Sequence, residues 1–494
     1  MEQDFIDQYK NIHQRGEKLG QGGQGIVFRT KDPDLAVKLV TKESGDPVTD
    51  MESLKKYSER FKNVLRLPLP KNLNVCTPKV LLQDQAGYVM QLLNEMIPFN
   101  HFINGHGHQE KKITSHDIPK WLSEAPEEEA KKIIHYSKTG GIRRRLMGLY
   151  HCAAVLARLH GCGMVYGDIS PSNIFISENL DHLSVWLIDA DNIRFDEIEK
   201  GKSVFTPRYG APELVQGKDG GRPSSDCYAF AVVAFYILSL IHPFCGKKLT
   251  ETDDNSDWAD DENSNDNIEE QAYAGLLSWV DDQEDDSNSS ESGFRRSLIL
   301  TEKLTILFDN TFNETGRISP LSRPTIYHWP SALAQAADMT IQCPSCNMYY
   351  YYDFIHPETS EHHCPYCKEK RPRIFILKTY RWYGKEKPLR TPCWLYAREV
   401  VDDPHFSVIL PKRVFYEFTM RDSDDDYISL SIEDKGVIVK KIDNESNKDN
   451  LLIATGDDQQ SSFQKIVSSM RLSSGCFWLF VHSKNPRLVH CSIQ

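Results

Sequence analysis

The chain has 494 residues and a formal net charge of −12. Its length predicts two to four domains, and it contains no apolar run approaching the roughly eighteen residues that a membrane-spanning helix needs. The polar first residues lack the apolar core of a secretion signal, so we expect a cytoplasmic protein with no membrane association. Twelve cysteines spread over such a chain argue against a disulfide framework.

The acidity is local. Residues 251–292 contain sixteen Asp and Glu and no Lys or Arg, so removing their charge of −16 from −12 leaves +4 for the remaining chain. This Asp-, Asn- and Ser-rich block is typical of a mobile, solvated insertion, within which AYAGLLSWV can dock locally. The net charge therefore says little about partners.

Residues 15–95 predict strands with one helix. The stretches EKLGQGGQGIVFRT and LAVKLV alternate like paired strands, and PKVLLQD and GYVMQLL predict two more. Between them, DMESLKKYSERFKNVLRL has helical spacing, with Leu54, Tyr57, Phe61 and Leu65 on one side.

From residue 96 helices dominate the pattern. GIRRRLMGLYHCAAVLARLHGCG is apolar at helical spacing, and CYAFAVVAFYILSLIHPF is apolar nearly all round, which indicates a buried helix. Further helical stretches lie at 299–312 and 324–338. After Pro372 the alternation of β-branched and aromatic residues predicts a β-rich domain.

The glycine-rich stretch GQGGQGIV has Gly20, Gly22 and Gly25, followed by Val27. Glycines let the backbone approach phosphate oxygens and offer N–H groups to them, although glycine-rich hairpins are also common without this role. Thirteen residues after Gly25, Lys38 lies in an apolar strand, from which it can reach nucleotide phosphates.

A buried lysine needs a carboxylate to hold it. The following helix offers Glu52 and Glu59, which are seven residues apart and can face the same side. We expect Glu59 to pair with Lys38, because it lies nearer the middle of the helix.

The stretch VYGDISPSN places Asp168 five residues before Asn173. Such a segment is also a common turn composition, but Asp168 can accept the proton of an attacking hydroxyl and Asn173 can bind a metal ion. Sixteen residues later Asp189 ends an apolar strand, where a carboxylate is costly unless it is paired or bound to metal. Together these are the parts of a phosphoryl-transfer site.

At this point the chain resembles the eukaryotic-type protein kinase fold, with these residues in matching order: Gly20, Gly22, Gly25, Lys38, Asp168, Asn173 and Asp189. The likeness continues beyond them over residues 17–338. It implies that Glu213 in YGAPEL closes the activation segment, that Arg323 pairs with Glu213, and that Asp226 braces the catalytic loop.

The resemblance also implies an ATP site with Mg²⁺ or Mn²⁺ held by Asn173 and Asp189. Met90 would lie at the rear of the adenine pocket and Gln91 to Leu93 would form the hinge. The residues implied to line the nucleotide are Gly20, Gly22, Gly25, Ile26, Val27, Ala36, Lys38, Met90, Gln91 and Leu93.

The chain departs from the family pattern at four positions. Gly167 replaces the arginine that clamps an activation-loop phosphate, so we expect activity without phosphorylation of Ser203 or Thr206. Ser170 replaces a lysine near the transferred phosphate. Ala190 and Asp191 replace the Phe and Gly of the Asp-Phe-Gly motif, which indicates a site held in one state or one regulated elsewhere. Asp191 can alternatively help to hold metal.

Two CxxC pairs, Cys343 with Cys346 and Cys364 with Cys367, are separated by seventeen residues. Four thiolates at this spacing can surround one tetrahedral Zn²⁺, and the segment resembles a zinc ribbon. His362 and His363 adjoin the second pair and can substitute as ligands. The neighbouring KEKRPR run favours a solvated linker over a nucleic-acid contact.

We therefore predict an α+β protein with four parts: residues 1–95 and 96–338 as the two lobes of a kinase-like domain, 339–373 as a zinc ribbon, and 374–494 as a β-rich interaction domain. The last part resembles a forkhead-associated domain in strand spacing only, since it lacks the Gly-Arg and Ser-x-x-His motifs.

The resemblance implies an ATP-dependent protein serine/threonine kinase with a protein substrate. A small-molecule phosphotransferase and a catalytically weak pseudokinase scaffold remain as alternatives. The YGDxSPSN form followed by a zinc ribbon is similar to bacterial kinases of tellurite-resistance-type triads, which implies a metal-dependent protein phosphatase and a von Willebrand factor A protein as partners.

Overall fold

The computed structural model describes residues 4–22, 25–42, 44–103, 113–196, 204–249, 262–354, 363–383, 391–400, 406–420, 424–433, 436–442, 452–455, 464–465, 469–473, 477–481 and 486–494. The chain forms two compact units. The first contains Met1–Glu110, Gly148–Arg295 and Glu302–Trp329; the second contains Lys111–Met147, Arg296–Thr301 and Pro330–Gln494. The four-part division at residues 95, 338 and 373 stays a prediction.

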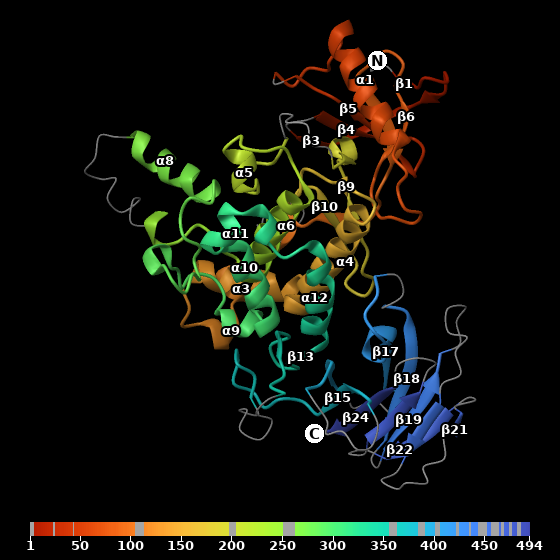
Figure 1. The fold of residues 1–494 in the computed structure, drawn as a ribbon, viewed down its shortest axis with the longest axis vertical. Helices are drawn as coiled ribbons and strands as arrows, with labels where there is room; N and C mark the ends of the chain where they lie inside the picture. The colour runs from red at the N-terminus through yellow and green to blue at the C-terminus, as the bar shows by residue number, and fades with distance from the viewer. Residues whose placement is uncertain are drawn as a thin grey trace. The chain divides into compact units, whose positions relative to one another are not determined.

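A five-stranded antiparallel sheet begins the first unit, in the order β3-β4-β5-β7-β6 (Figure 1). Its strands are β3 (Arg15–Gly22), β4 (Gly25–Thr30), β5 (Leu35–Leu39), β6 (Pro78–Leu81) and β7 (Gly87–Gln91), preceded by the pair β1 (Phe5–Ile6) and β2 (Ile12–His13). Alternate residues of the sheet, among them Phe28, Val37 and Val89, pack into one apolar cluster.

Helix α1 (Met51–Arg66) packs on this sheet. It begins at Asp50, whose side chain accepts a hydrogen bond from the Ser53 backbone N–H, as helix N-caps do. Phe61 and Val64 are buried, and Phe61 contacts the Tyr88 ring edge-on with centroids 4.9 Å apart. Leu65, which the pattern placed on the apolar side, is 39% exposed.

Helices make up most of the remaining first unit. Helix α6 (Pro223–Ser239) is buried on nearly every side, as its uniformly apolar sequence predicts. The other helices are α2 (Asn100–Ile103), the end of α4 (Gly141–His160), α5 (Pro212–Val215), α8 (Glu262–Tyr273), α10 (Glu302–Phe312) and α11 (Glu314–Ile318). Short strands frame the catalytic loop: β8 (Met96–Pro98), β9 (Met164–Val165), β10 (Ile174–Ser177), β11 (Val185–Leu187) and β12 (Arg194–Phe195).

Part of the acidic block is ordered, where a mobile insertion was expected, and the expected local docking of AYAGLLSWV is confirmed. Trp279 is 1% exposed and packs against Phe235 and Phe312. The Asn288 amide donates to the carbonyls of Phe244 and Ser278. The apolar residues inside this segment therefore outweigh its charge, while residues 250–261 lie outside the described part.

The second unit combines helices with a six-stranded and a four-stranded β-sheet. Its helices are α3 (Glu127–Lys138), the start of α4, α9 (Arg296–Ile299) and α12 (Trp329–Asp338), whose first residue belongs to the first unit. One sheet has the order β16-β15-β24-β23-β20-β21 and the other β17-β18-β19-β22.

The strands of these sheets are β15 (Ile374–Arg381), β16 (Trp394–Glu399), β17 (Ser407–Pro411), β18 (Asp426–Glu433), β19 (Gly436–Lys441), β20 (Leu452–Thr455), β21 (Gln464–Lys465), β22 (Ser469–Ser473), β23 (Phe477–Val481) and β24 (Arg487–Ile493). A hairpin of β13 (Thr340–Gln342) and β14 (Tyr349–Tyr351) precedes them. Within the described part of the chain, no helix has both the length and the apolar character needed to cross a membrane.

Candidate active site

The catalytic loop lies between β9 and β10 and is held by Asp226 at the start of α6. The backbone N–H groups of Tyr166 and Gly167 donate to the two Asp226 oxygens at 2.8 and 2.9 Å, and His160 Nε2 lies 3.0 Å from the same carboxylate. The Asp226 carboxylate therefore holds the backbone of the catalytic loop at Tyr166 and Gly167.

Gly167 has a positive φ of 89°, which favours glycine. A Cβ at this position would also lie 3.4 Å from the Arg194 guanidinium. Arg194 donates to the Gly221 carbonyl at 2.7 Å, and Arg222 pairs with Asp196 at 3.1 Å. The start of the activation segment is therefore tied to residues 219–222 by protein groups alone.

Asp168 is buried between the catalytic loop and the activation segment. Its Oδ1 accepts bonds from the Thr206 hydroxyl at 2.7 Å and the Thr206 N–H at 2.8 Å. The Asn173 amide donates to its carbonyl and to Oδ2. Burial, with a smaller contribution from the Asp189 charge, raises the pKa of Asp168 above that of an ordinary carboxyl, although the Thr206 bonds oppose this. Ser203 lies outside the described residues.

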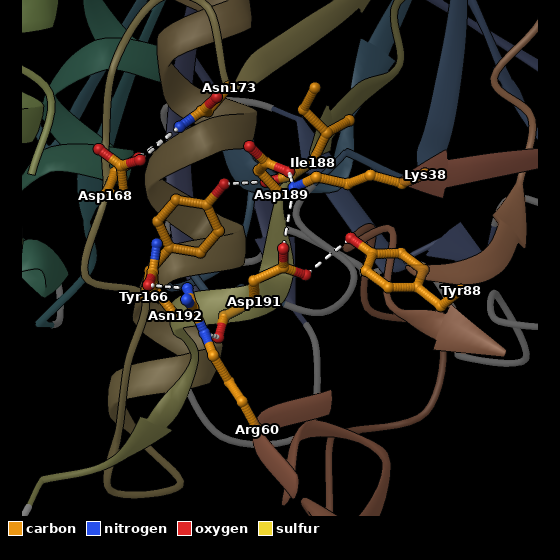
Figure 2. Close-up of polar contacts among 10 residues, drawn as sticks. All are labelled: Lys38, Arg60, Tyr88, Tyr166, Asp168, Asn173, Ile188, Asp189, Asp191 and Asn192. Carbon is orange, nitrogen blue, oxygen red and sulfur yellow. Dashed lines mark hydrogen bonds and ion pairs between the residues drawn. The ribbon is translucent and has the colours of Figure 1, made fainter. Parts of the chain in front are cut away.

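Asp189 follows β11 and faces Lys38 of β5 across the site (Figure 2). Its backbone is left-handed, with φ 59° and ψ 45°, a conformation that is costly for residues other than glycine and is typical of functional sites. Lys38 is 4% exposed and bonds to the Asp189 carboxylate. The side chains of Asp168, Asn173, Asp189 and Lys38 thus gather in one place, as Figure 2 shows.

Lys38 has a second carboxylate partner, Asp191. Lys38 Nζ donates to Asp191 Oδ2 at 2.8 Å, and the Tyr88 hydroxyl donates to Asp191 Oδ1 at 2.7 Å (Figure 2). Burial alone would lower the pKa of Lys38, but the charges of Asp191 and Asp189 overcome this and raise it, so the lysine stays protonated.

The expected pairing of Glu59 with Lys38 is not found in the structure. Glu59 is exposed and contacts Lys62 at 3.5 Å on the same helix. The next residue, Arg60, faces the site instead: its Nε donates to the Asp191 carbonyl at 2.9 Å and its Nη2 bonds to Asn192. One residue turns the side chain by about 100° around a helix, which explains the difference.

The residues expected to line a nucleotide lie in the sheet beside Lys38. Ala36 pairs with Met90, and Val27 with Lys38, in neighbouring strands. At Gly25 a Cβ would stand 2.2 Å from the Leu39 carbonyl oxygen, so the close approach of β4 and β5 requires glycine. Gly20 and Gly22 lie on β3 with open space around them, Ile26 on β4, Gln91 ends β7, and Leu93 follows it half-buried.

Glu213 and Arg323 form a buried bidentate pair. Both N···O distances are 2.8 Å, and the Ser225 hydroxyl donates to Glu213 at 2.8 Å. Arg323 also donates to the Gly316 carbonyl at 2.6 Å. This network joins the end of the activation segment to α6, to α11 and to the loop after α11.

The residues present fit a nucleotide with a divalent cation. Asn173 turns its amide nitrogen to Asp168, which leaves its oxygen to a cation, and carboxylate and amide oxygens suit Mg²⁺. Among the described residues, the buried Ser170 hydroxyl of the catalytic loop is one of the side-chain polar atoms with no hydrogen-bond partner. Lys38 supplies a protonated amine next to Asp189.

The four predicted cysteines of the second unit meet in one cluster. All four Sγ atoms lie within 4.8 Å of one another. The pairs Cys343–Cys367 and Cys346–Cys364 are 3.6 and 3.7 Å apart, close to the ~3.8 Å edge of a tetrahedron with Zn–S bonds of about 2.3 Å. The geometry therefore fits Zn²⁺ without rearrangement.

The cysteine cluster shares its apolar core with the β domain. Cys343 and Cys364 are buried together with Ile341, Ile374 and Ile376, the last two of which belong to β15. Trp121 and Tyr366, both in the second unit, also form a ring contact with centroids 6.4 Å apart. In the described residues, the cysteine loops and β15 are thus parts of one core.

Sequence comparison matches the protein kinase domain family over residues 13–291, which is more than half of the chain. The chain belongs to the protein kinase domain family. The match covers the glycine-rich hairpin, Lys38, the catalytic loop and the Asp189 segment, and family membership implies the use of ATP and Mg²⁺.

Curated kinases resemble this kinase domain at low identity. Ribosomal protein S6 kinase alpha-2 of Mus musculus is 25% identical over 242 residues, which cover 47% of this chain and 28% of the relative. A probable serine/threonine-protein kinase of Dictyostelium discoideum is 25% identical over 240 residues, 46% of this chain and 14% of the relative. Ribosomal protein S6 kinase alpha-3 of Homo sapiens is 33% identical over 105 residues, 21% and 14% of the two chains. The chain thus spans less than a third of the length of each of these relatives.

The sequence analysis missed three contacts of the kinase site. These are made by Arg60, by Tyr88, and by Thr206 with Asp168. Arg60 adjoins the residue that was chosen, and Tyr88 lies in a strand that was predicted, but neither carries a spacing signal of its own. The unusual Asp191 was the one available pointer, because a carboxylate in a buried segment needs cationic or hydroxyl partners.

Proposed function

We propose that the chain is an ATP- and Mg²⁺-dependent protein kinase that transfers the γ-phosphoryl group to serine or threonine hydroxyls. The observation that carries the proposal is the assembly of Lys38, Asp168, Asn173 and Asp189 in one buried site. Phosphoryl transfer needs positioning and charge stabilisation, and these four side chains supply both.

In the proposed mechanism Lys38 orients the ATP phosphates, and the Gly20–Gly25 hairpin covers them. Asn173 and Asp189 would hold Mg²⁺, which when bound neutralises charge on the phosphate oxygens. Asp168 aligns the acceptor hydroxyl and takes its proton. The 2.7 Å bond from the Thr206 hydroxyl to Asp168 supports this role, because a substrate serine or threonine would present the same group.

Separate features of the chain argue against a pseudokinase and against a small-molecule phosphotransferase. Ser170, Ala190 and Asp191 motivate a pseudokinase, but the buried cluster keeps both metal-binding side chains. A small-molecule phosphotransferase is disfavoured by the Glu213–Arg323 pair, which stabilises the activation segment on which a protein substrate docks. Serine/threonine specificity is supported by the distant relatives.

The second unit is proposed to hold structural Zn²⁺ and to bind partners rather than to catalyse. The cysteine geometry supports the metal, and the β-rich region suits an interaction domain. The forkhead-associated likeness, the bacterial triad, its phosphatase and von Willebrand factor A partners, and the cytoplasmic location remain predictions.

The test uses radiolabelled ATP with Mg²⁺ or Mn²⁺, casein as acceptor, and the full chain. We expect label on the chain or on casein as phosphoserine or phosphothreonine, and its loss in Asp168→Asn. Nucleotide binding with no transfer by the wild type would overturn the enzyme in favour of the pseudokinase. Phosphotyrosine alone would overturn the serine/threonine assignment.

A further inference from the structure

The carboxylate that holds Lys38 comes from an unusual place. Protein kinases pair this lysine with a glutamate of the helix that follows it. Here α1 is described over its full length, and the bonds described for Lys38 go to Asp189 and Asp191. We propose that Asp191 is the positioning residue for Lys38 and replaces the helix glutamate; this rests on the kinase activity proposed above.

Both oxygens of Asp191 are already committed to protein donors. Oδ2 accepts from Lys38 at 2.8 Å and Oδ1 accepts from Tyr88 at 2.7 Å, and the side chain is 4% exposed. A buried carboxylate held by these two donors is a poor metal ligand, because a cation there would lie close to the Lys38 ammonium and would disturb buried hydrogen bonds. Asp189 is more exposed, at 22% for its side chain, and remains the metal ligand.

Asp191 also keeps Lys38 from binding Asp189 alone. With a single carboxylate, the lysine would compete with the metal for Asp189. With Asp191 present, Lys38 Nζ bonds to both carboxylates, so its positive charge is shared between them. Lys38 can then contact a phosphate of ATP while its bond to Asp191 holds it in place.

Helix α1 contributes a cation to this arrangement. Arg60 donates to the Asp191 carbonyl at 2.9 Å and bonds to the Asn192 side chain (Figure 2). The ion pair of other kinases joins a lysine in the sheet to an anion on the helix. In this chain the anion lies on the segment that carries the metal ligand, and the helix holds that segment with a guanidinium.

The test compares ATP turnover, with water and casein as acceptors, in the full-length wild type, Asp191→Asn and Asp191→Gly. Restoring the family's glycine should lower kcat rather than raise it, by about 100-fold, because the lysine loses its anchor. The KM for ATP should change several-fold less. In a Lys38→Met background, Asp191→Asn should cost little more, because it acts through the lysine. Glu59→Gln, on the exposed face of α1, should match the wild type.

Several outcomes overturn the proposal. These are Asp191→Gly with wild-type kcat, additive losses in the double variant, recovery of Asp191→Asn at raised Mg²⁺, or a loss in Glu59→Gln. If the wild type transfers no phosphate, the proposed function fails while a crystal structure with Mg²⁺ and a non-hydrolysable ATP analogue still decides this inference. A Lys38–Asp191 bond in that structure supports it, and Asp191 bound to Mg²⁺ refutes it.

Discussion

At the scale of single residues, the sequence identifies the catalytic side chains but does not identify which residue of α1 faces them. Lys38, Asp168, Asn173 and Asp189 were found from their order and spacing, because phosphoryl transfer needs those groups. The partner of Lys38 could not be found in this way. A helical pattern defines an apolar face to within about one residue, and one residue separates exposed Glu59 from Arg60.

His242 shows how a buried side chain can make stability depend on pH. Its Nε2 donates to the Arg208 carbonyl at 2.9 Å, and its Nδ1 accepts from the Phe244 N–H at 3.3 Å. These two bonds satisfy both nitrogens of the neutral ring, and the rings of Tyr236 and Tyr273 pack against it. Burial, reinforced by the Arg208 charge, lowers the pKa of His242 to about 4.

The unfolded chain should take up a proton at His242 near pH 6.5, whereas the folded chain should not until about pH 4. We therefore expect acidification through this window to lower the free energy of unfolding by about 3 kcal/mol through this residue. Urea unfolding at pH 7.5, 5.5 and 4 measures this change in the free energy of unfolding. His242→Gln should flatten the dependence, and an identical dependence in both proteins would contradict the assignment.

At the scale of elements, the helix that follows Lys38 was predicted correctly but its function was not. The apolar spacing of Leu54, Tyr57 and Phe61 places α1 on the sheet, and these residues do pack there. What α1 does to the site depends on contacts with residues 191–192, more than 130 positions away. No local pattern encodes such a contact.

Arg60→Met should weaken the hold of α1 on the Asp189–Asn192 segment. Hydrogen bonds of a charged group contribute about 1.5–3 kcal/mol, so we expect kcat for ATP turnover to fall roughly 10- to 100-fold. Lys62→Met provides the matched control, since Lys62 lies on the same helix and pairs with exposed Glu59. Equal activities of the two variants would show that α1 does not act through Arg60.

At the scale of the whole molecule, the sequence predicted the kinase domain, the four-cysteine group and a β-rich C-terminal region. It did not predict that residues 111–147 share a compact unit with the cysteines and the β strands. The cysteine loops and β15 share buried residues such as Ile341 and Ile376. Which apolar surfaces meet over such sequence distances is decided by packing and not by pattern.

Removal of Zn²⁺ should destabilise the second unit. Structural zinc contributes on the order of 10 kcal/mol to the folding of small zinc modules, and this cluster lies in a shared core. We expect Cys364→Ser to lose bound zinc and to lower the midpoint temperature of the calorimetric transition of the second unit. ATP should still raise the midpoint temperature of the first unit. Cys162→Ser, which changes an exposed cysteine outside the cluster, is the control. Unchanged calorimetry after confirmed metal loss would rule out a structural role.

The guanidinium of Arg60 changes what a selective inhibitor of this protein should look like. A compound that extends past Lys38 toward the helix in other kinases finds a carboxylate there and needs a hydrogen-bond donor. In this chain the helix carries Arg60, and the nearby carboxylate is engaged by Lys38 and Tyr88. A compound that depends on donating to the usual helix glutamate should therefore lose that contact in this chain, because the nearby Asp191 carboxylate is already held by Lys38 and Tyr88.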